Sequence, residues 1–144
     1  MHATVRSVIE TASSAAEDVC ILDTEASPEH LSRGTAQYVE TMLIVVEPYY
    51  KSLETGRRMA LLGNDLGLPH VSLVANKIRD QRELEAVNQF AGQHSLEVGG
   101  VVPFDESFPE SERAQQAPLD FAPDSAGVGA IAQIGRQLAR DGRA

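Results

Sequence analysis

Four short apolar runs, separated by stretches with helical periodicity, constrain the fold of this chain most strongly. They lie at residues 19–22, 42–46, 71–75 and 98–102, and the second, Met-Leu-Ile-Val-Val, is the clearest strand because β-branched residues dominate it and Pro48 follows it. An uninterrupted apolar run is typical of a strand that is covered on both faces, as in a parallel sheet. Because the runs alternate with helical stretches, we predict an α/β fold with a parallel sheet of about four strands and flanking helices.

Apolar residues at three- and four-residue spacing predict the helices. We expect helices over residues 4–17, 52–66, 110–116 and about 126–140, and a short helix or helical loop over residues 31–39. A further helix begins after Asp80, which forms a capping box with Glu83. No repeat, low-complexity tract or linker divides the sequence, so we expect residues 1–144 to form one domain.

The charge and the cysteine content exclude several classes of protein. The formal net charge is -9 and the pI is about 4.8, which argues against non-specific binding to nucleic acid or to anionic membranes. The single cysteine, Cys20, rules out an internal disulfide framework and fits a reducing compartment. No run is apolar enough to span a bilayer, and the N-terminal residues lack the apolar core of a signal peptide. We expect a cytoplasmic protein with neither a nucleic acid nor a membrane as its partner.

Polar residues follow each apolar run at the point where the predicted strand ends. The first run is followed by Asp23-Thr24-Glu25, the second by Glu47-Pro48, the third by Asn76-Lys77 and the fourth by Pro103-Phe104-Asp105. In a parallel sheet these four ends lie on one edge, where open α/β sheets bind their ligands. The joint pattern predicts a ligand site at this edge.

The residue types at this edge suit a nucleotide. Asp23 can orient a magnesium-bound water beside a phosphate; alternatively, it only ends a strand. The carboxamide of Asn76 can read a purine edge, and the stem of Lys77 can pack on the ring. Pro103 and Phe104 could flank the same base. The alternative for Asn76 is a turn residue after a strand, and the alternative for Phe104 is packing in the core.

One stretch of the sequence resembles a known family. Asp23-Thr24-Glu25-Ala26, followed by Glu29-His30 and Arg33-Gly34-Thr35, resembles the switch II region of the carbon monoxide dehydrogenase maturation ATPases, the nickel-insertion accessory proteins. These are similar to the MinD, ParA and nitrogenase iron-protein group of P-loop ATPases. Residues 45–48, 52–55, 76–77 and 102–105 match later landmarks of the family in the same order. The resemblance therefore extends over nearly all of the chain.

The resemblance implies a partial P-loop NTPase fold with ATP or ADP and magnesium as cofactors. Asp23 would hold magnesium through water. The nucleotide-sensing switch would consist of Glu25, His30 and Arg33. The adenine would be surrounded by Asn76, Lys77, Pro103, Phe104 and Asp105.

The sequence also departs from the family. It has no glycine-rich Lys-Ser/Thr loop and no Cys-x-Cys pair, so the resemblance covers the C-terminal half of such proteins and hydrolysis by this chain alone is not expected. Three hypotheses follow. The chain is part of a maturation ATPase that delivers nickel to a metalloenzyme client, a non-catalytic dimerisation or interaction module, or one half of a split ATPase.

The missing loop also affects the sheet. In this family the phosphate-loop strand lies between the strands that correspond here to residues 19–22 and 42–46. An unpaired apolar strand is an aggregation hazard. We therefore expect the strand at residues 19–22 to pair elsewhere or with a second chain, most simply in a symmetric homodimer.

Overall fold

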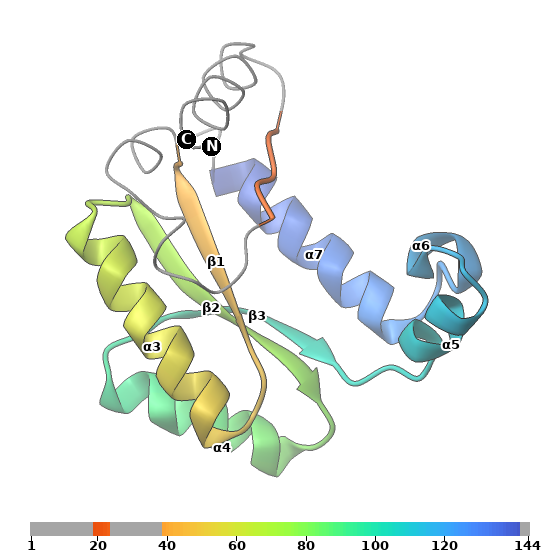
Figure 1. Cartoon of the computed structure of the whole chain (residues 1–144), viewed down its shortest axis with the longest axis horizontal. Coiled ribbons are helices and arrows are strands. Elements are labelled where there is room, and N and C mark those ends of the chain that lie inside the picture. The colour runs from red at the N-terminus through yellow and green to blue at the C-terminus, as the bar shows by residue number, and fades with distance from the viewer. Residues whose placement is uncertain (1–18, 24–38, 142–144) are drawn as a thin grey trace.

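The structure is a computed structural model that describes residues 19–23 and 39–141 (Figure 1). Three strands, β1 (Thr41–Val46), β2 (His70–Ile78) and β3 (Val98–Pro103), form a parallel sheet in the order β1-β2-β3. Thr41 pairs with His70 and Val46 with Ala75, so β1 is in register with the first six residues of β2. The predicted α/β fold with a parallel sheet is confirmed, and three of its four expected strands are present.

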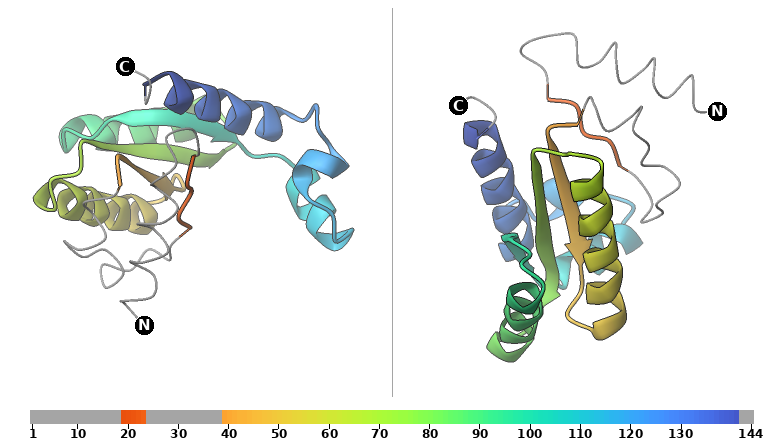
Figure 2. Two further views of the ribbon diagram at one scale, coloured as in Figure 1. Left: turned by 90° about the horizontal axis from the view of Figure 1, so that it is seen from above. Right: turned by 90° about the vertical axis from the view of Figure 1, so that its left-hand side faces the viewer.

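The helices form layers on the two faces of this sheet (Figures 1 and 2). Helices α3 (Tyr50–Asp65) and α4 (Gln81–Gln93) share one buried core with β1 and β2, whereas α7 (Ala126–Asp141) packs against β3 on the opposite face. Two short helices, α5 (Ser107–Arg113) and α6 (Pro118–Phe121), project from the body beyond the end of β3. All helical segments that the sequence predicts within residues 39–141 are present, although α5 begins three residues earlier than expected.

Local signals in the sequence place the ends of two helices. The Asp80 carboxylate accepts a hydrogen bond from the Glu83 amide at 2.9 Å, as the capping box predicts. The Glu83 carboxylate returns to the amide of Arg79, at 2.7 Å, rather than to that of the N-cap residue. After α3 the chain passes through Gly67, whose φ of +78° lies in the left-handed region that glycine adopts without steric cost.

The core lies between the sheet and the pair α3 and α4. Leu73 and Ala75 of the central strand are buried against Leu53 and Ala60 of α3, and Val87 of α4 completes this layer. Burial of these side chains is the main favourable contribution to the stability of such a layer. Leu53 and Ala60 therefore belong to the inward face of α3.

The strand predicted over residues 19–22 is wrong for this structure. Residues 19–23 have no regular secondary structure, and Val19 and Ile21 are 83% and 87% exposed. A strand needs a neighbour to bond its backbone amides and carbonyls. No strand in the described part of the chain pairs with residues 19–22 or with the outer edge of β1.

The helix predicted over residues 4–17 lies outside the described residues, as does nearly all of the segment at 31–39.

The close approach of α3 to β1 depends on Gly56. A Cβ atom at this position would lie 2.5 Å from Cγ1 of the buried residue Val46, closer than packed atoms can come. We expect Gly56→Ala to lower the free energy of unfolding by about 1–3 kcal/mol, because a rigid β-branched side chain must shift within a packed core. Urea unfolding monitored by circular dichroism measures the change.

Gly92→Ala in α4 is the matched control, because a Cβ at Gly92 would have no neighbour within 4 Å. This variant should be stabilised by about 0.5–1 kcal/mol through helix propensity alone. Equal effects of the two substitutions would contradict the close packing at Gly56.

Candidate nucleotide site at the carboxyl edge of the sheet

The residues predicted to surround a base lie in the walls of one groove between the sheet and α7. The groove has a volume of about 350 Å³. Its floor is apolar and includes Val45, Val74 and Val102 of the three strands, and α7 contributes Ile131 and Ile134. The rim at the carboxyl edge includes Asn76, Lys77, Pro103, Phe104 and Asp105. The topology thus brings together five residues that the sequence places on one sheet edge.

The end of β2 has an irregular backbone. Lys77 has a φ of +57°, a conformation that is uncommon for residues other than glycine, and the register between β2 and β3 shifts between Ala75 and Ile78. The side-chain oxygen of Asn76 accepts a hydrogen bond from the Lys77 amide at 3.0 Å. The ammonium of Lys77 lies 2.7 Å from the Glu47 carboxylate, which links the ends of β1 and β2. Asn76 is therefore a turn residue and also a wall of the groove.

The side-chain nitrogen of Asn76 donates to no residue within 19–23 and 39–141. A carboxamide whose oxygen is bonded to the backbone presents its two N–H groups to a ligand as donors. Purine rings carry nitrogen acceptors on their edges. Asn76 is therefore able to bind a purine by donation rather than by a paired donor and acceptor.

Phe104 follows β3 and is held by the turn after β2. Its amide donates to the carbonyl of Ile78 at 2.9 Å, and the Cζ atom of Arg79 lies 4.4 Å from the centre of its ring. This distance is within the range of cation–π contacts. Phe104 is half-buried, so it neither lies in the core nor stands free. Arg79 is not among the residues predicted to surround a base, although its position just after β2 on this same edge was a usable signal.

Asp105 anchors the start of α7. One carboxylate oxygen accepts from the Ser107 amide at 2.9 Å and from the Ser107 hydroxyl at 2.6 Å, and the other accepts from the Gly127 amide at 2.8 Å. The hydroxyl of Ser107, followed by the two backbone amides, lowers the pKa of Asp105 from 3.8 to about 2. These bonds join the loop after β3 to α7, so the carboxylate shapes one wall of the groove.

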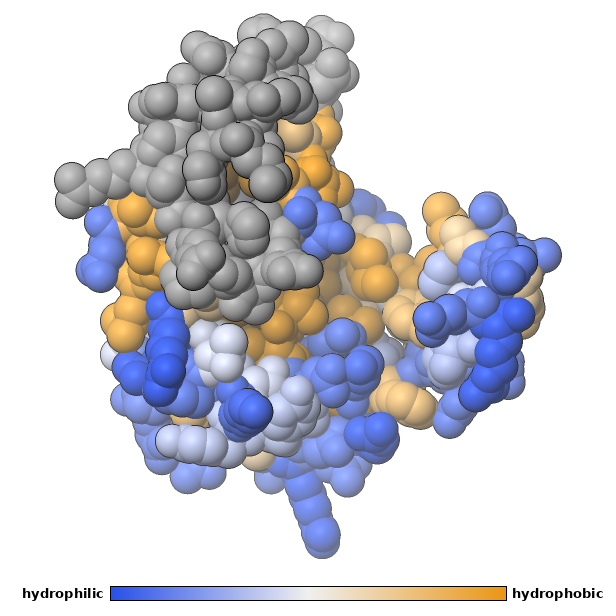
Figure 3. Space-filling model, in the orientation of Figure 1, coloured by the Kyte–Doolittle hydropathy of each residue, from blue (hydrophilic) through white to orange (hydrophobic). Residues whose placement is uncertain are grey.

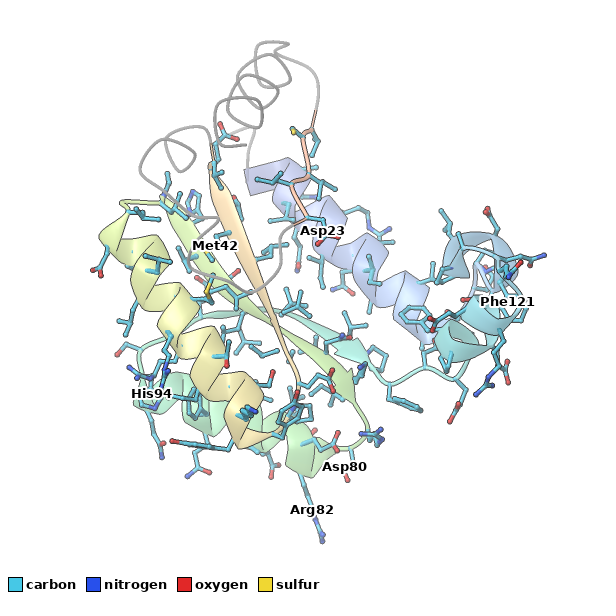
Figure 4. All side chains as sticks on the ribbon, viewed as in Figure 1. Asp23, Met42, Asp80, Arg82, His94 and Phe121 are labelled. Atoms are coloured by element: carbon cyan, nitrogen blue, oxygen red, sulfur yellow. The ribbon has the colours of Figure 1, made fainter. Side chains whose placement is uncertain are left out.

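The structure does not bring Asp23 to this edge. Asp23 is exposed and does not line the groove, and Figure 4 shows it well away from Asp80, which follows the carboxyl end of β2. Its expected place in the sheet is wrong because residues 19–22 are not a strand here. Glu25, His30 and Arg33, which form the predicted nucleotide-sensing switch, lie outside the described residues. Among the described residues, no three His, Cys, Asp or Glu side chains are grouped in a way that could hold a metal ion.

Comparisons with known proteins match both the sequence and the fold. An uncharacterized ATP-binding protein of Methanocaldococcus jannaschii is 43% identical over 96 residues, which are 67% of this chain and 37% of that protein. The carbon monoxide dehydrogenase accessory protein CooC of Rhodospirillum rubrum is 30% identical over 122 residues, 85% of this chain and 46% of CooC. The chain is a relative of CooC. It spans less than half the length of either protein, and no protein-family model matches it.

Solved structures identify the fold to which this CooC relative belongs. A ParA family ATPase from Chlorobium tepidum superposes with a TM-score of 0.76 at 21% identity, over 92% of this chain and 55% of that one. MinD from Pyrococcus horikoshii, solved with Mg-ADP, superposes with a TM-score of 0.68 at 16% identity, over 94% and 55% of the two chains. The fold is that of the MinD and ParA ATPases. Within the described residues, no helix has both the length and the hydrophobicity needed to cross a bilayer.

The hydrogen bonds of Asp105 predict a dependence of stability on pH. Because its pKa is lowered in the folded state, the stabilisation is complete above the ordinary value of 3.8 and is lost as the pH falls toward 2. We expect Asp105→Asn to melt at a lower temperature than the wild type. The difference between the two melting temperatures should be constant above about pH 5 and should shrink below it. Thermal melts of both proteins across this range measure the difference.

Asp120→Asn in α6 is the control, since Asp120 lies outside the contact between the β3 loop and α7. Its melting temperature should follow that of the wild type. A difference for Asp105→Asn that does not change with pH would show that the Asp105 carboxylate does not stabilise the start of α7.

Proposed function

We propose that this chain is the base-binding part of an ATPase-like domain that takes ATP or ADP with magnesium. The observation that carries this proposal is the meeting of Asn76, Lys77, Pro103 and Phe104 around one groove at the carboxyl edge of a parallel sheet. Ligands bind at this edge in open α/β sheets. The names of two relatives, an ATP-binding protein and CooC, and the Mg-ADP bound to a MinD of the same fold support the choice of nucleotide.

The groove suits the base of a nucleotide rather than its phosphates. Val45, Val74 and Val102 provide an apolar surface for a flat ring, and Asn76 provides directed N–H donors. Small-molecule sites typically combine a mainly apolar lining with a few placed polar groups. The side chain of Lys77 is 51% exposed, and its ammonium beside Glu47 gives the rim a cation near the groove.

The phosphate end of the site needs groups that these 144 residues do not contain. Phosphoryl transfer depends on backbone amides and a lysine that surround the phosphates, and the sequence has no glycine-rich Lys-Ser/Thr loop. In our proposal a further segment or chain supplies this loop and pairs with residues 19–22. That pairing brings Asp23 to the carboxyl edge, where it holds magnesium through water. Glu25, His30 and Arg33 then sense the phosphate, and the present chain alone binds nucleotide without hydrolysing it.

The role in the cell that we propose is ATP-dependent delivery of nickel to a metalloenzyme client. Two observations support this role: the sequence match to the accessory protein CooC and the resemblance of residues 23–35 to nickel-insertion ATPases. Nickel is cargo in this proposal, and its site would lie on the segment that supplies the phosphate loop.

Calorimetric titration of the purified chain with Mg-ADP, up to millimolar concentrations, tests the base site. We expect measurable binding. We expect Asn76→Ala to weaken it by about tenfold or more, because the acceptors on the purine edge lose the N–H donors of Asn76. Asn88→Ala, an exposed asparagine on α4, is the matched control and should bind as the wild type does. A well-folded chain that binds no nucleotide would refute the proposal and favour the non-catalytic interaction module.

The outer edge of β1 favours an assembly with another strand. Thr41–Val46 contains no charged residue, and no described strand pairs with its outer edge. Two of its side chains on the face of the groove are exposed, Leu43 by 37% and Val45 by 62%, and Ile131 of α7 is 51% exposed nearby. Figure 3 shows hydrophobic surface in the hollow between the sheet and the α5–α6 projection. Unpaired apolar edges of this kind associate with other strands.

We propose that this edge is covered either by a second copy, in a homodimer, or by the chain that supplies the missing strands. Sedimentation equilibrium of the isolated chain distinguishes the two. A homodimer should dissociate when Val45 is changed to lysine, because the charge would be buried at the new strand pair. Leu61→Lys, at an exposed apolar residue of α3, should leave the association unchanged. A monomeric wild-type chain would refute the homodimer and favour the split ATPase.

A further inference from the structure

The turn after β2 and the loop after β3 are joined by Arg79, which lies outside the lining of the groove. Its guanidinium carbon is 4.4 Å from the centre of the Phe104 ring, whereas Phe104 itself lines the groove. Arg79 thus touches Phe104 from a side other than the groove. The contact through which Arg79 can act on a molecule in the groove is therefore the Phe104 ring.

Both partners of this contact are fixed by further bonds. The Arg79 amide donates to the Glu83 carboxylate at 2.7 Å, and its guanidinium lies 3.7 Å from the same carboxylate. The Phe104 amide donates to the Ile78 carbonyl at 2.9 Å, directly before Arg79 in the chain. Phe104 is therefore held at two points, its backbone by the carbonyl of Ile78 and its ring by the Arg79 side chain, which lies beside Glu83 at the start of α4.

We propose that Arg79 is a positioning residue for the base, which holds the Phe104 ring at the rim of the groove so that a purine packs against it. This inference rests on the proposed function. Arg79 is then a determinant of affinity beyond the residues predicted at the strand ends. A ring that is already held loses little conformational entropy when a base packs on it, and such preorganisation increases affinity.

The chemistry of the side chain explains why arginine occupies this position. The guanidinium is planar, remains charged at all accessible pH values and stacks on aromatic rings. Lysine would keep the charge beside Glu83 without a flat surface for the ring. Glutamine would keep a flat group without the charge. The two substitutions therefore separate stacking from charge at the Phe104 ring.

Titration with Mg-ADP of the wild type, Arg79→Gln, Phe104→Leu and the double variant tests the proposal. We expect Arg79→Gln to weaken binding about two- to fivefold, which is the strength of a partly exposed cation–π contact. In the Phe104→Leu background the same substitution should have no further effect, because its route to the base is gone. Arg79→Lys should bind with intermediate affinity. Because it keeps the charge beside Glu83, this variant also tests the proposal if Arg79→Gln folds poorly.

Arg82→Lys is the matched control, since Arg82 extends from the start of α4 into solvent (Figure 4) and should bind as the wild type does. Unchanged binding by Arg79→Gln, or an equal loss in both backgrounds, would overturn the role of Arg79 and leave the base site intact. A folded wild-type chain that does not bind Mg-ADP would instead overturn the proposed function, and the role of Arg79 with it.

Discussion

The parallel pairing of β2 with both of its neighbours is the constraint on which the rest of the structure depends. Leu73 and Ala75 on this central strand are buried against α3 and α4, and Val74 on its other face forms the floor of the groove. Because all three strands run in the same direction, the loops that follow them meet at one edge. The site residues are therefore neighbours because of the topology, although 30 positions in the sequence separate Glu47 from Lys77.

Much of this arrangement is predictable from local patterns. The apolar runs at β1, β2 and β3 each find a parallel partner, and the pair Asp80 and Glu83 marks the start of α4 as expected. These predictions succeed because a strand covered on both faces and a capped helix leave strong local signals. The meeting of Asn76 with Pro103 and Phe104 follows from the same reasoning once the strands are known to be parallel.

The features that the sequence did not reveal depend on contacts between distant residues. Residues 19–22 have the composition of a strand, but a strand forms only where a neighbour bonds its backbone, and composition says nothing about that neighbour. The contact of Arg79 with Phe104 joins residues 25 positions apart, and the hydrogen bond that the Gly127 amide donates to Asp105 joins residues 22 positions apart. Such pairs become visible only when the loops after β2 and β3 are placed in space.

The left-handed backbone conformation of Lys77 has a cost in stability, and it places a cation at the carboxyl edge of the sheet. A left-handed conformation costs a residue with a side chain on the order of 1 kcal/mol, a cost that glycine does not have. The ion pair with Glu47 is partly exposed, and pairs of this kind return at most about 1 kcal/mol. A sequence optimised only for thermal resistance would have glycine here. Lys77 therefore holds a positive charge at this edge without a net gain in the stability of the fold.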